Sequence, residues 1–199
     1  MSIYHDHYSS KTTPKKRKVV VVGDSGTGKS SLLDAIRQGY PSPGKASTTV
    51  DNSVYTVNVN NQLELDLWDI PGSGTEDYER LRPLSYAGMH ASVICFSIDS
   101  RSSFDSVRDK WAPEMLHYLS ENTFVLLALK CDMRNNLEQG SKLNLVSYEE
   151  ASYILLGLKL AKEINALHYL ECSAVENRDI INCVKQIAQV ALSESYLCN

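Results

Sequence analysis

Apolar residues recur along this chain in two patterns: short runs, which are typical of strands, and regularly spaced positions, which are typical of helices. Val19 to Val22 is an unbroken β-branched run, as in a parallel strand buried on both faces. Leu63, Leu65 and Leu67 alternate with acidic residues, which is the period of a half-buried strand. These two patterns predict strands, the first of them beginning near residue 18.

The same two patterns predict further strands and helices. Helices are predicted after Gly23, over a stripe that includes Phe104, Trp111 and Met115, over residues 147–165, and from Ile180 onward. The remaining predicted strands are residues 54–59, 91–98, 124–129 and 168–172, with a hairpin turn at 60–61. Alternation of strands and helices predicts an α/β fold, with a six-stranded, mostly parallel sheet flanked by helices on both faces.

The composition suits one globular domain without structural metals or disulfides. The chain has 199 residues, 43% of them hydrophobic and 22% charged, and its five cysteines form no C-x-x-C pair. A formal net charge of −4 gives no overall basic field, so no nucleic-acid partner is expected. We predict a flexible tail over residues 1–16, one domain over 17–193, a short tail over 194–199 and reduced thiols in the cytoplasm.

Residues 23–30 read GDSGTGKS and fit the pattern G-x-x-x-x-G-K-[ST], between a predicted strand and a predicted helix. Glycines let backbone N–H groups turn toward phosphate oxygens, and the helix N-terminus adds the positive end of its dipole. Lys29 supplies a charge for the β- and γ-phosphates, and the Ser30 hydroxyl suits Mg²⁺. The loop predicts a P-loop protein that binds a nucleoside triphosphate. The predicted phosphate-binding residues are Gly23, Asp24, Ser25, Gly26, Thr27, Gly28, Lys29, Ser30 and Ser31.

Three further motifs stand at the ends of predicted strands. Residues 69–72 fit D-x-x-G, residues 129–132 (LKCD) fit a degenerate N-K-x-D, and residues 171–174 read ECSA. Each motif is short, but open α/β sheets bind ligands at the carboxyl ends of their strands. Their order and placement therefore indicate that the three segments belong to the same nucleotide site.

With these motifs the chain resembles the Ras-like small GTPases, and within them the Rho family. The Rho-like segments are EDYERLRPLSY over residues 76–86, CFSIDS over 95–100 and KWAPE over 110–114. The resemblance covers about residues 17–193. It implies the small G-protein fold of the P-loop NTPases, GTP and GDP as ligands, Mg²⁺ as cofactor and GTP hydrolysis as activity.

The resemblance implies a base pocket. Asp132 would accept hydrogen bonds from the N1–H and 2-amino groups of guanine, a donor pattern that adenine lacks. Lys130 and Tyr40 would pack against the base, and the backbone N–H of Ala174 would meet O6. Ser173 belongs to the same nucleotide-binding segment.

The resemblance also implies a metal and catalytic set. The metal residues would be Ser30, Thr48 and Asp69, with Thr49 as the alternative to Thr48 because the preceding loop departs from the family pattern. The Gly72 N–H would meet the γ-phosphate. The predicted catalytic residues are Lys29, Thr48, Gly72 and Thr75. Exchange factors, GTPase-activating proteins and effectors would bind a monomer through the two switch segments, residues 41–53 and 72–86.

Four departures from the family pattern stand out. No glutamine follows D-x-x-G, where residues 73–75 read Ser-Gly-Thr, and Ser25 replaces the usual third glycine of the loop. Because the glutamine orients the attacking water, both changes predict slow intrinsic hydrolysis unless Ser73, Thr75 or a partner substitutes. Leu129 replaces the asparagine of N-K-x-D and Val175 replaces the lysine of S-A-K, which predicts weaker nucleotide binding. Cys198, second from the end, fits no prenylation box, so no intrinsic membrane anchor is predicted.

Several alternatives stay open. Residues 14–19 match a basic nuclear-import pattern but also approach the first strand, and acylation at Cys198 would give peripheral membrane association. The apolar stretch 154–160 suits either a thick buried face or an exposed partner site. The function is a cycling, slow GTPase switch or a GTP-bound, non-cycling effector-binding module. Asp132 and the Rho-like segments argue against a P-loop kinase or ATPase.

Overall fold

The computed structural model describes residues 13–39, 47–48, 53–60, 62–73, 75–119, 123–134 and 153–193. These residues form one seven-stranded sheet in the order β2-β3-β4-β1-β5-β6-β7. β3 pairs antiparallel with β2 and β4, and every other pairing is parallel. The strands are β1 (Lys15–Val22), β2 (Ser47–Thr48), β3 (Ser53–Asn60), β4 (Leu63–Asp69), β5 (Ala91–Ser97), β6 (Phe124–Leu129) and β7 (His168–Glu171). The predicted six-stranded, mostly parallel sheet is confirmed by the six longer strands, and the two-residue β2 extends its edge.

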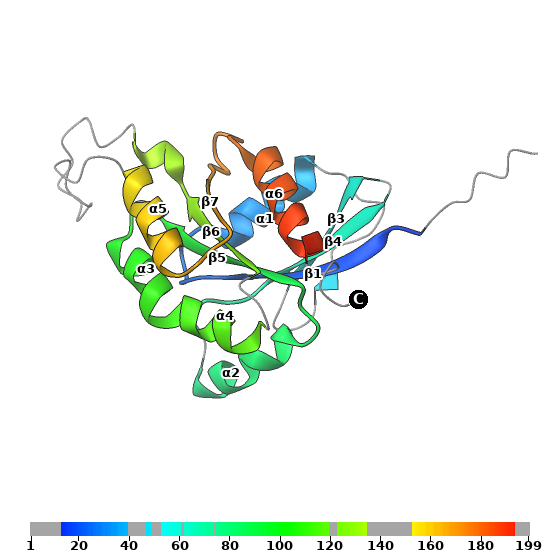
Figure 1. Cartoon of the computed structure of the whole chain (residues 1–199), viewed down its shortest axis with the longest axis horizontal. Coiled ribbons are helices and arrows are strands. Elements are labelled where there is room, and N and C mark those ends of the chain that lie inside the picture. Colours follow the sequence, from blue (N-terminus) through cyan, green and yellow to red (C-terminus); the bar gives the residue numbers. More distant parts are fainter. Residues whose placement is uncertain are drawn as a thin grey trace, which may run out of the picture.

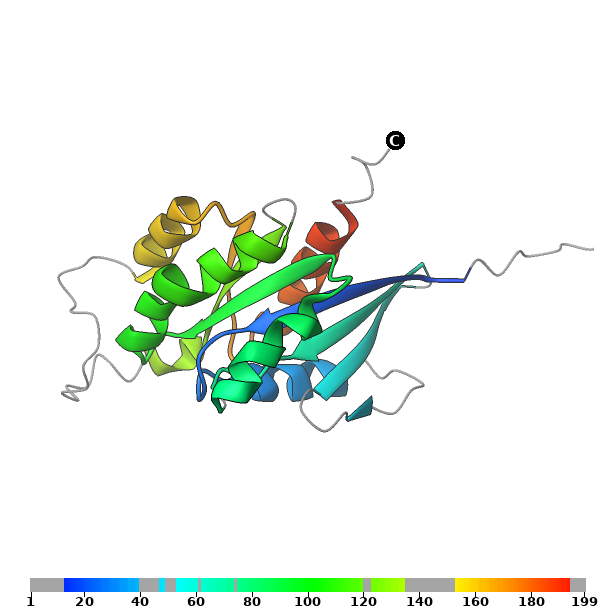
Figure 2. The same ribbon diagram turned by 90° about the horizontal axis from the view of Figure 1, so that it is seen from below.

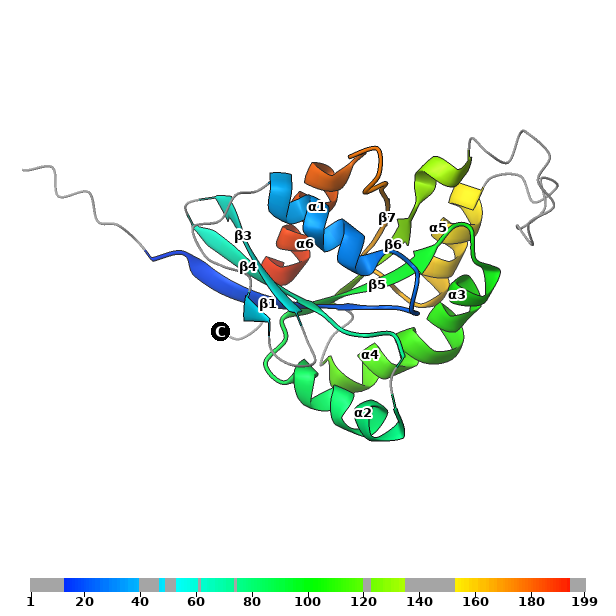
Figure 3. The same ribbon diagram turned by 180° about the vertical axis from the view of Figure 1, so that it is seen from behind.

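Helices cover both faces of this sheet. Figures 1 and 3 show α1 and α6 on one side of the strands, and α2, α3 and α4 on the other. In the view from below, α2 and the run from α3 to α4 lie in front of the sheet (Figure 2). The helical segments are α1 (Lys29–Gly39), α2 (Glu76–Leu81), the 3-10 turn η1 (Arg82–Tyr86), α3 (Arg101–Ser106), the π-helical turn η2 (Val107–Trp111), α4 (Ala112–Tyr118), α5 (Tyr153–Glu163) and α6 (Ile180–Ser193).

The two faces of β1 build two separate cores, because successive side chains of a strand point to opposite sides. Val19 and Val21 pack with α1 and α6, whereas Val20 and Val22 pack with the α3–α4 run and α5. All four valines are buried, as predicted for a strand covered on both faces. This burial fixes the carboxyl end of β1, where the P-loop begins.

The first strand is longer than the hydrophobic run predicts. β1 begins at Lys15 rather than near residue 18, and residues 15–18 pair with residues 63–66 of β4. Lys16 forms an ion pair with Glu64 at 2.5 Å, and the Lys18 ammonium lies 3.9 Å from the centroid of the Trp68 ring. The basic residues of the import-like pattern therefore belong to the sheet, and tertiary pairing overrides the low strand propensity of lysine.

The apolar stretch near residue 154 is split between core and surface. Within α5, Leu160 is fully buried, whereas Leu155 is 57% exposed and Leu158 is 48% exposed. Gly157 lies directly against the ring of Tyr169 in β7. α5 is shorter than the predicted helix 147–165, and residues 147–152 lie outside the described part of the chain.

Candidate nucleotide site

The P-loop connects the end of β1 to α1, as its motif predicts. The buried Lys29 ammonium donates to the carbonyl oxygens of Gly23 at 2.7 Å and Asp24 at 2.9 Å. The Thr27 hydroxyl donates to the same Asp24 carbonyl at 2.9 Å. Burial lowers the pKa of Lys29 from its usual value, because the charged ammonium loses hydration. A phosphate beside the loop would supply the negative charge that offsets this loss.

Gly28 opens the helix with a backbone φ of 105°, a conformation that side chains rarely adopt. A methyl group placed at Gly28 would lie 3.8 Å from Cε of Lys130 and 3.9 Å from Cδ1 of Leu129. The segment after β6 therefore lies beside the P-loop. Leu129, which replaces the family's asparagine, is buried there and offers an apolar contact instead of a hydrogen bond.

Oxygen donors gather where β4 ends. The Ser30 hydroxyl donates to Oδ2 of Asp69 at 2.5 Å, which joins the start of α1 to the D-x-x-G motif. Hydroxyl and carboxylate oxygens are ligands that Mg²⁺ prefers, so the two predicted residues that the structure brings together fit this ion. The third, Thr48, lies in β2 opposite Ser53 of β3. No cluster of three His, Cys, Asp or Glu side chains suited to a metal occurs within the described ranges.

The backbone of the D-x-x-G segment packs directly against the backbone of the P-loop. A Cβ at Gly72 would lie 2.3 Å from the carbonyl oxygen of Gly23 and 2.4 Å from the nitrogen of Ser25. Only glycine fits this position. Between these segments lies a groove of about 470 Å³, lined by Ser25, Gly26, Gly28, Lys29, Ser30, Ser31, Asp69, Pro71, Gly72 and Lys130.

Two of the predicted base-binding residues, Asp132 and Ser173, are in direct contact. The buried Ser173 hydroxyl donates to Oδ1 of Asp132 at 2.6 Å, and the Cys131 N–H donates to the carbonyl of Cys172. These bonds join the segments that follow β6 and β7. Lys130 is held by an ion pair with Asp99 at 3.3 Å, next to Gly28. Ala174 follows Ser173, whereas Val175 is 86% exposed, so the residue that replaces the family's lysine makes no core contact.

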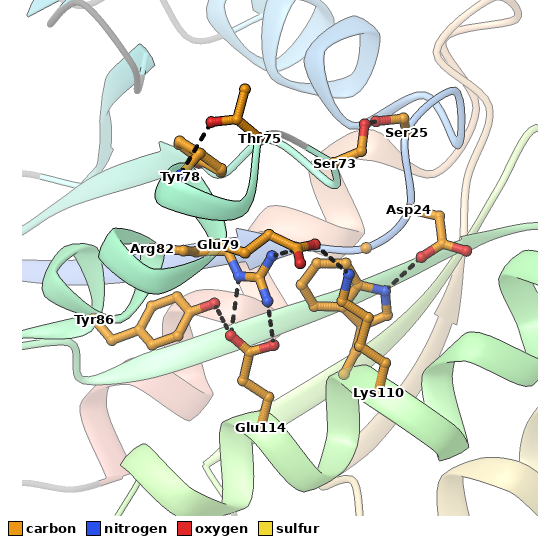
Figure 4. A network of polar contacts seen from close by, with 12 residues as sticks. Asp24, Ser25, Ser73, Thr75, Tyr78, Glu79, Arg82, Tyr86, Lys110 and Glu114 are labelled. Atoms are coloured by element: carbon orange, nitrogen blue, oxygen red, sulfur yellow. Dashed lines mark hydrogen bonds and ion pairs between the residues drawn. The ribbon is translucent and has the colours of Figure 1, made fainter.

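The second switch segment, residues 72–86, begins with the hydroxyl side chains of Ser73 and Thr75. The Oγ atoms of Ser25 and Ser73 lie 2.8 Å apart in a hydrogen bond (Figure 4). Thr75 is the N-cap of α2, and its hydroxyl accepts a hydrogen bond from the Tyr78 N–H at 3.3 Å. The two substitutions that depart from the family pattern thus contact each other, and Thr75 stabilises the start of the helix.

Sequence reasoning missed a set of polar contacts behind the P-loop. The Trp111 indole N–H donates to Oδ1 of Asp24 at 2.8 Å, and Arg82 and Tyr86 both bind the carboxylate of Glu114. Burial, followed by the hydrogen bond to Glu114, raises the pKa of Tyr86 well above its usual value. The helical spacing of Trp111 predicted its burial correctly but carried no signal for a hydrogen bond to a residue 87 positions away.

The side chains of three predicted site residues are not described. Tyr40, predicted to pack against the base, and Thr49, the alternative switch threonine, lie outside the described part of the chain, as do residues 41–46 of the first switch segment. The side chain of Thr48 is likewise not described. In the described ranges, no helix has the length and apolar character that crossing a membrane requires.

A glycine-rich loop at the end of a buried strand, a hydroxyl–carboxylate pair and strand-end motifs along one sheet edge define a P-loop nucleotide-binding protein. The Ras family model matches residues 18–193. GTP-binding protein rho3 of Schizosaccharomyces pombe is 41% identical over 188 residues, which cover 94% of this chain and 88% of that protein. GTP-binding protein RHO3 of Saccharomyces cerevisiae is 35% identical over 220 residues, covering 97% and 92%.

The similarity extends beyond fungi. Rho-related GTP-binding protein RhoF of Homo sapiens is 38% identical over 180 residues, covering 90% of this chain and 84% of that protein. The chain belongs to the Rho family of small GTPases. Members of this family are GTP hydrolases that bind guanine nucleotides with Mg²⁺ and generally interact with exchange factors, GTPase-activating proteins and effectors.

Proposed function

We propose that this chain is a GTP-dependent signalling switch whose intrinsic GTP hydrolysis is slow. The observation that carries the proposal is the 2.8 Å hydrogen bond between the Ser25 and Ser73 hydroxyls, at the groove beside Lys29 and Gly72. It joins the two positions at which the chain departs from the family's hydrolytic pattern. The departures therefore act at one place rather than two.

The chemistry of a hydroxyl explains why hydrolysis would be slow. A glutamine amide carries two donors and one carbonyl acceptor on a long side chain, so it can bind a water and a phosphate oxygen together. Ser73 is shorter and has a single O–H, and in the pair with Ser25 one of the two hydroxyls donates its only hydrogen to the other. The pair is a poor substitute for an amide that orients water.

The nucleotide itself would be held by the residues that the groove brings together. Lys29 and the loop N–H groups would bind the phosphates, Ser30 and Asp69 would hold Mg²⁺, and Asp132 would select guanine. Magnesium would neutralise charge on the β- and γ-phosphates. Residues 41–53 and 72–86 would meet exchange factors, activators and effectors.

Single-turnover hydrolysis of bound GTP tests the proposal, with Schizosaccharomyces pombe rho3 measured in parallel. We expect the chain to hydrolyse GTP at least about tenfold more slowly than rho3, because a water-orienting group contributes 10²-fold or more. Ser25→Gly, which opens the space beside the γ-phosphate, is expected to raise the rate. Equal rates for this chain and rho3 would refute the proposal.

A second variant separates a slow enzyme from one with a substitute catalyst. Ser73→Ala removes the hydroxyl and keeps the backbone. If Ser73 orients water, this variant hydrolyses GTP more slowly than the natural chain, and the proposal is wrong. We expect an unchanged or higher rate. The nucleotide recovered from purified protein distinguishes a slowly cycling GTPase from a non-cycling binding module. A cycling enzyme leaves GDP in the site, whereas a non-cycling module retains GTP.

A further inference from the structure

Asp24 is the single acidic residue of the loop that would bind phosphate, residues 23–30. A carboxylate that faced the phosphate groove would repel phosphate oxygens, because like charges repel strongly where water is excluded. The next residue, Ser25, lines this groove, whereas Asp24 does not. Figure 4 shows the Asp24 carboxylate pointing away from the hydrogen-bonded hydroxyls of Ser25 and Ser73. The loop therefore turns its one negative side chain away from the groove.

The direction of the Asp24 side chain is set by Trp111. The Trp111 indole N–H donates to Oδ1 of Asp24 at 2.8 Å. Trp111 is fully buried and packs in the same core as Val22, which precedes the P-loop. A buried indole N–H needs an acceptor, and the Asp24 carboxylate supplies it. One hydrogen bond thus satisfies a buried donor and orients the acid.

Trp111 has little freedom to follow the carboxylate if the carboxylate moves. It belongs to η2 and directly precedes α4. The guanidinium carbon of Arg82 lies 5.0 Å from the centroid of its ring, and Arg82 is buried and donates to both oxygens of Glu114 at 3.0 and 2.8 Å. Bidentate, charge-assisted bonds of this kind are strong and directional. The indole is therefore a fixed donor.

The charge of Asp24 lies close to the place where the last phosphate of a nucleotide would bind. A Cβ at Gly72 would lie 2.5 Å from the carbonyl carbon of Asp24 and 2.4 Å from the nitrogen of Ser25. The peptide bond between Asp24 and Ser25 thus touches the residue whose N–H would meet the γ-phosphate. The Lys29 ammonium also donates to the Asp24 carbonyl at 2.9 Å. A carboxylate turned toward the groove would act most strongly on the terminal phosphate.

We propose that Trp111 is a positioning residue for nucleotide binding, whose indole N–H holds the Asp24 carboxylate away from the phosphates. The proposal rests on the proposed nucleotide site and adds to it a residue outside the P-loop that acts through Asp24. The role depends on charge, because a neutral side chain at residue 24 has no repulsion to avoid. Loss of the hydrogen bond therefore weakens binding of a triphosphate more than binding of a diphosphate.

Affinities for GDP and for a non-hydrolysable GTP analogue, measured at one Mg²⁺ concentration, test the proposal in Trp111→Phe. Phenylalanine keeps an aromatic ring and removes the N–H. We expect affinity for the GTP analogue to fall about fivefold or more relative to GDP, because the third phosphate adds charge near the freed carboxylate. Combining Trp111→Phe with Asp24→Asn should restore most of the natural ratio, since an amide is neutral. The effect of Trp111→Phe should also shrink as the salt concentration rises.

The control is Met115→Val, which removes volume from the same core and leaves the bond to Asp24 in place. It should not change the ratio of the two affinities. An equal loss for both nucleotides in Trp111→Phe, or a loss of ratio that Asp24→Asn does not reverse, would show that Trp111 only fills space. Either result overturns the proposal.

A second pair of variants leaves the buried ring intact, in case Trp111→Phe does not fold. Asp24→Glu and Asp24→Gln lengthen a half-buried side chain by the same amount and differ only in charge. The longer side chains shift the acceptor away from the Trp111 N–H. Asp24→Glu should lower the affinity for the GTP analogue relative to GDP, and more than Asp24→Gln does. Equal ratios in the two variants would overturn the proposal.

The outcomes separate this proposal from the proposed function. A natural chain that binds neither nucleotide refutes the nucleotide site, and the role of Trp111 falls with it. The hydrolysis rate is a separate measurement on the same protein. Fast hydrolysis together with a charge-dependent loss in Trp111→Phe refutes the slow switch alone, whereas slow hydrolysis with equal losses for both nucleotides refutes the role of Trp111 alone.

Discussion

The hydroxyl of Ser173 donates to the carboxylate of Asp132 at 2.6 Å, across two loops that follow neighbouring strands. Ser173 is fully buried, and its oxygen also accepts the Glu176 N–H at 3.1 Å, so its position is set from both sides. A carboxylate oxygen accepts more than one hydrogen bond. Asp132 is therefore oriented by the protein and retains acceptor capacity for a ligand.

Asp132→Ala is expected to remove the preference for GTP over ATP. A site built to accept hydrogen bonds from a substrate rejects an analogue that lacks the donors, and that rejection disappears with the acceptor. Losing two such bonds corresponds to about 10²-fold or more in relative affinity. Competition between GTP and ATP for the purified protein measures the ratio.

The control for Asp132→Ala is Glu176→Gln, which neutralises a nearby exposed acid that is paired with Arg178 rather than with Asp132. This variant should keep the natural ratio of GTP to ATP affinity. An unchanged ratio in Asp132→Ala would show that the base is selected elsewhere.

Ser30→Ala is expected to weaken nucleotide binding only when Mg²⁺ is present. The Ser30 hydroxyl lies 2.5 Å from the carboxylate of Asp69, and its loss removes one oxygen donor and the partner that orients the other. Removing such a group lowers metal affinity by about 10–100-fold. GDP affinity measured in Mg²⁺ and in a chelator gives the comparison. Equal losses in both conditions would indicate damage to the phosphate loop instead of a lost metal ligand.

Local patterns predicted the parts of the fold that depend on local chemistry. The buried run at Val19 and the glycine motif after it placed β1 and the P-loop, and the stripe that includes Trp111 and Met115 predicted a helix with a buried face. The start of β1 at Lys15 was missed because its pairing with β4, not its own side chains, extends the strand.

Contacts between distant residues could not be predicted from the same patterns. Ser25 and Ser73 were each identified as departures from the family, but their hydrogen bond depends on how closely Gly72 approaches the P-loop. A hydrophobic stripe predicts that Trp111 is buried, yet it does not predict where the indole N–H points. Only the packing of η2 against the P-loop brings that donor to Asp24.

His90 is expected to make stability depend on pH below the usual histidine range. Its Nδ1 accepts the N–H of Lys18 at 3.1 Å, which requires the unprotonated nitrogen. Burial, followed by the charge of Arg17, lowers the pKa of His90 below its usual value of about 6.5. The unfolded chain therefore binds the proton more readily. Stability is retained above pH 6.5 and falls as the pH drops toward the lower pKa of the folded state.

Urea unfolding at several pH values between 7.5 and 5 measures this effect, with His90→Asn as the comparison. Asparagine keeps an oxygen that can accept the Lys18 N–H but does not titrate. The natural chain should lose stability more steeply than His90→Asn as the pH falls. Parallel curves would show that His90 contributes no pH dependence.

Gly157→Ala is expected to destabilise the protein although alanine is the better helix former. A Cβ at this position would lie 2.1 Å from Cζ of Tyr169 and 2.3 Å from its hydroxyl. The ring has little freedom to move away, because its hydroxyl donates to Glu171, which Arg134 binds through both oxygens at 2.6 and 2.7 Å. Alanine gains about 1 kcal/mol in helix propensity. Overpacking costs about 1–3 kcal/mol, and disturbing the partly buried hydrogen bond between Tyr169 and Glu171 adds about 1–3 kcal/mol.

The balance of these effects is a net loss of about 1–5 kcal/mol in the free energy of unfolding, measured by chemical denaturation. Gly39→Ala at the end of α1 is the matched control, because a Cβ there meets no atom within 4 Å. That variant should be neutral or slightly stabilising. If Gly157→Ala behaves like Gly39→Ala, the ring of Tyr169 yields freely, and the contacts among Tyr169, Glu171 and Arg134 do not hold α5 against β7.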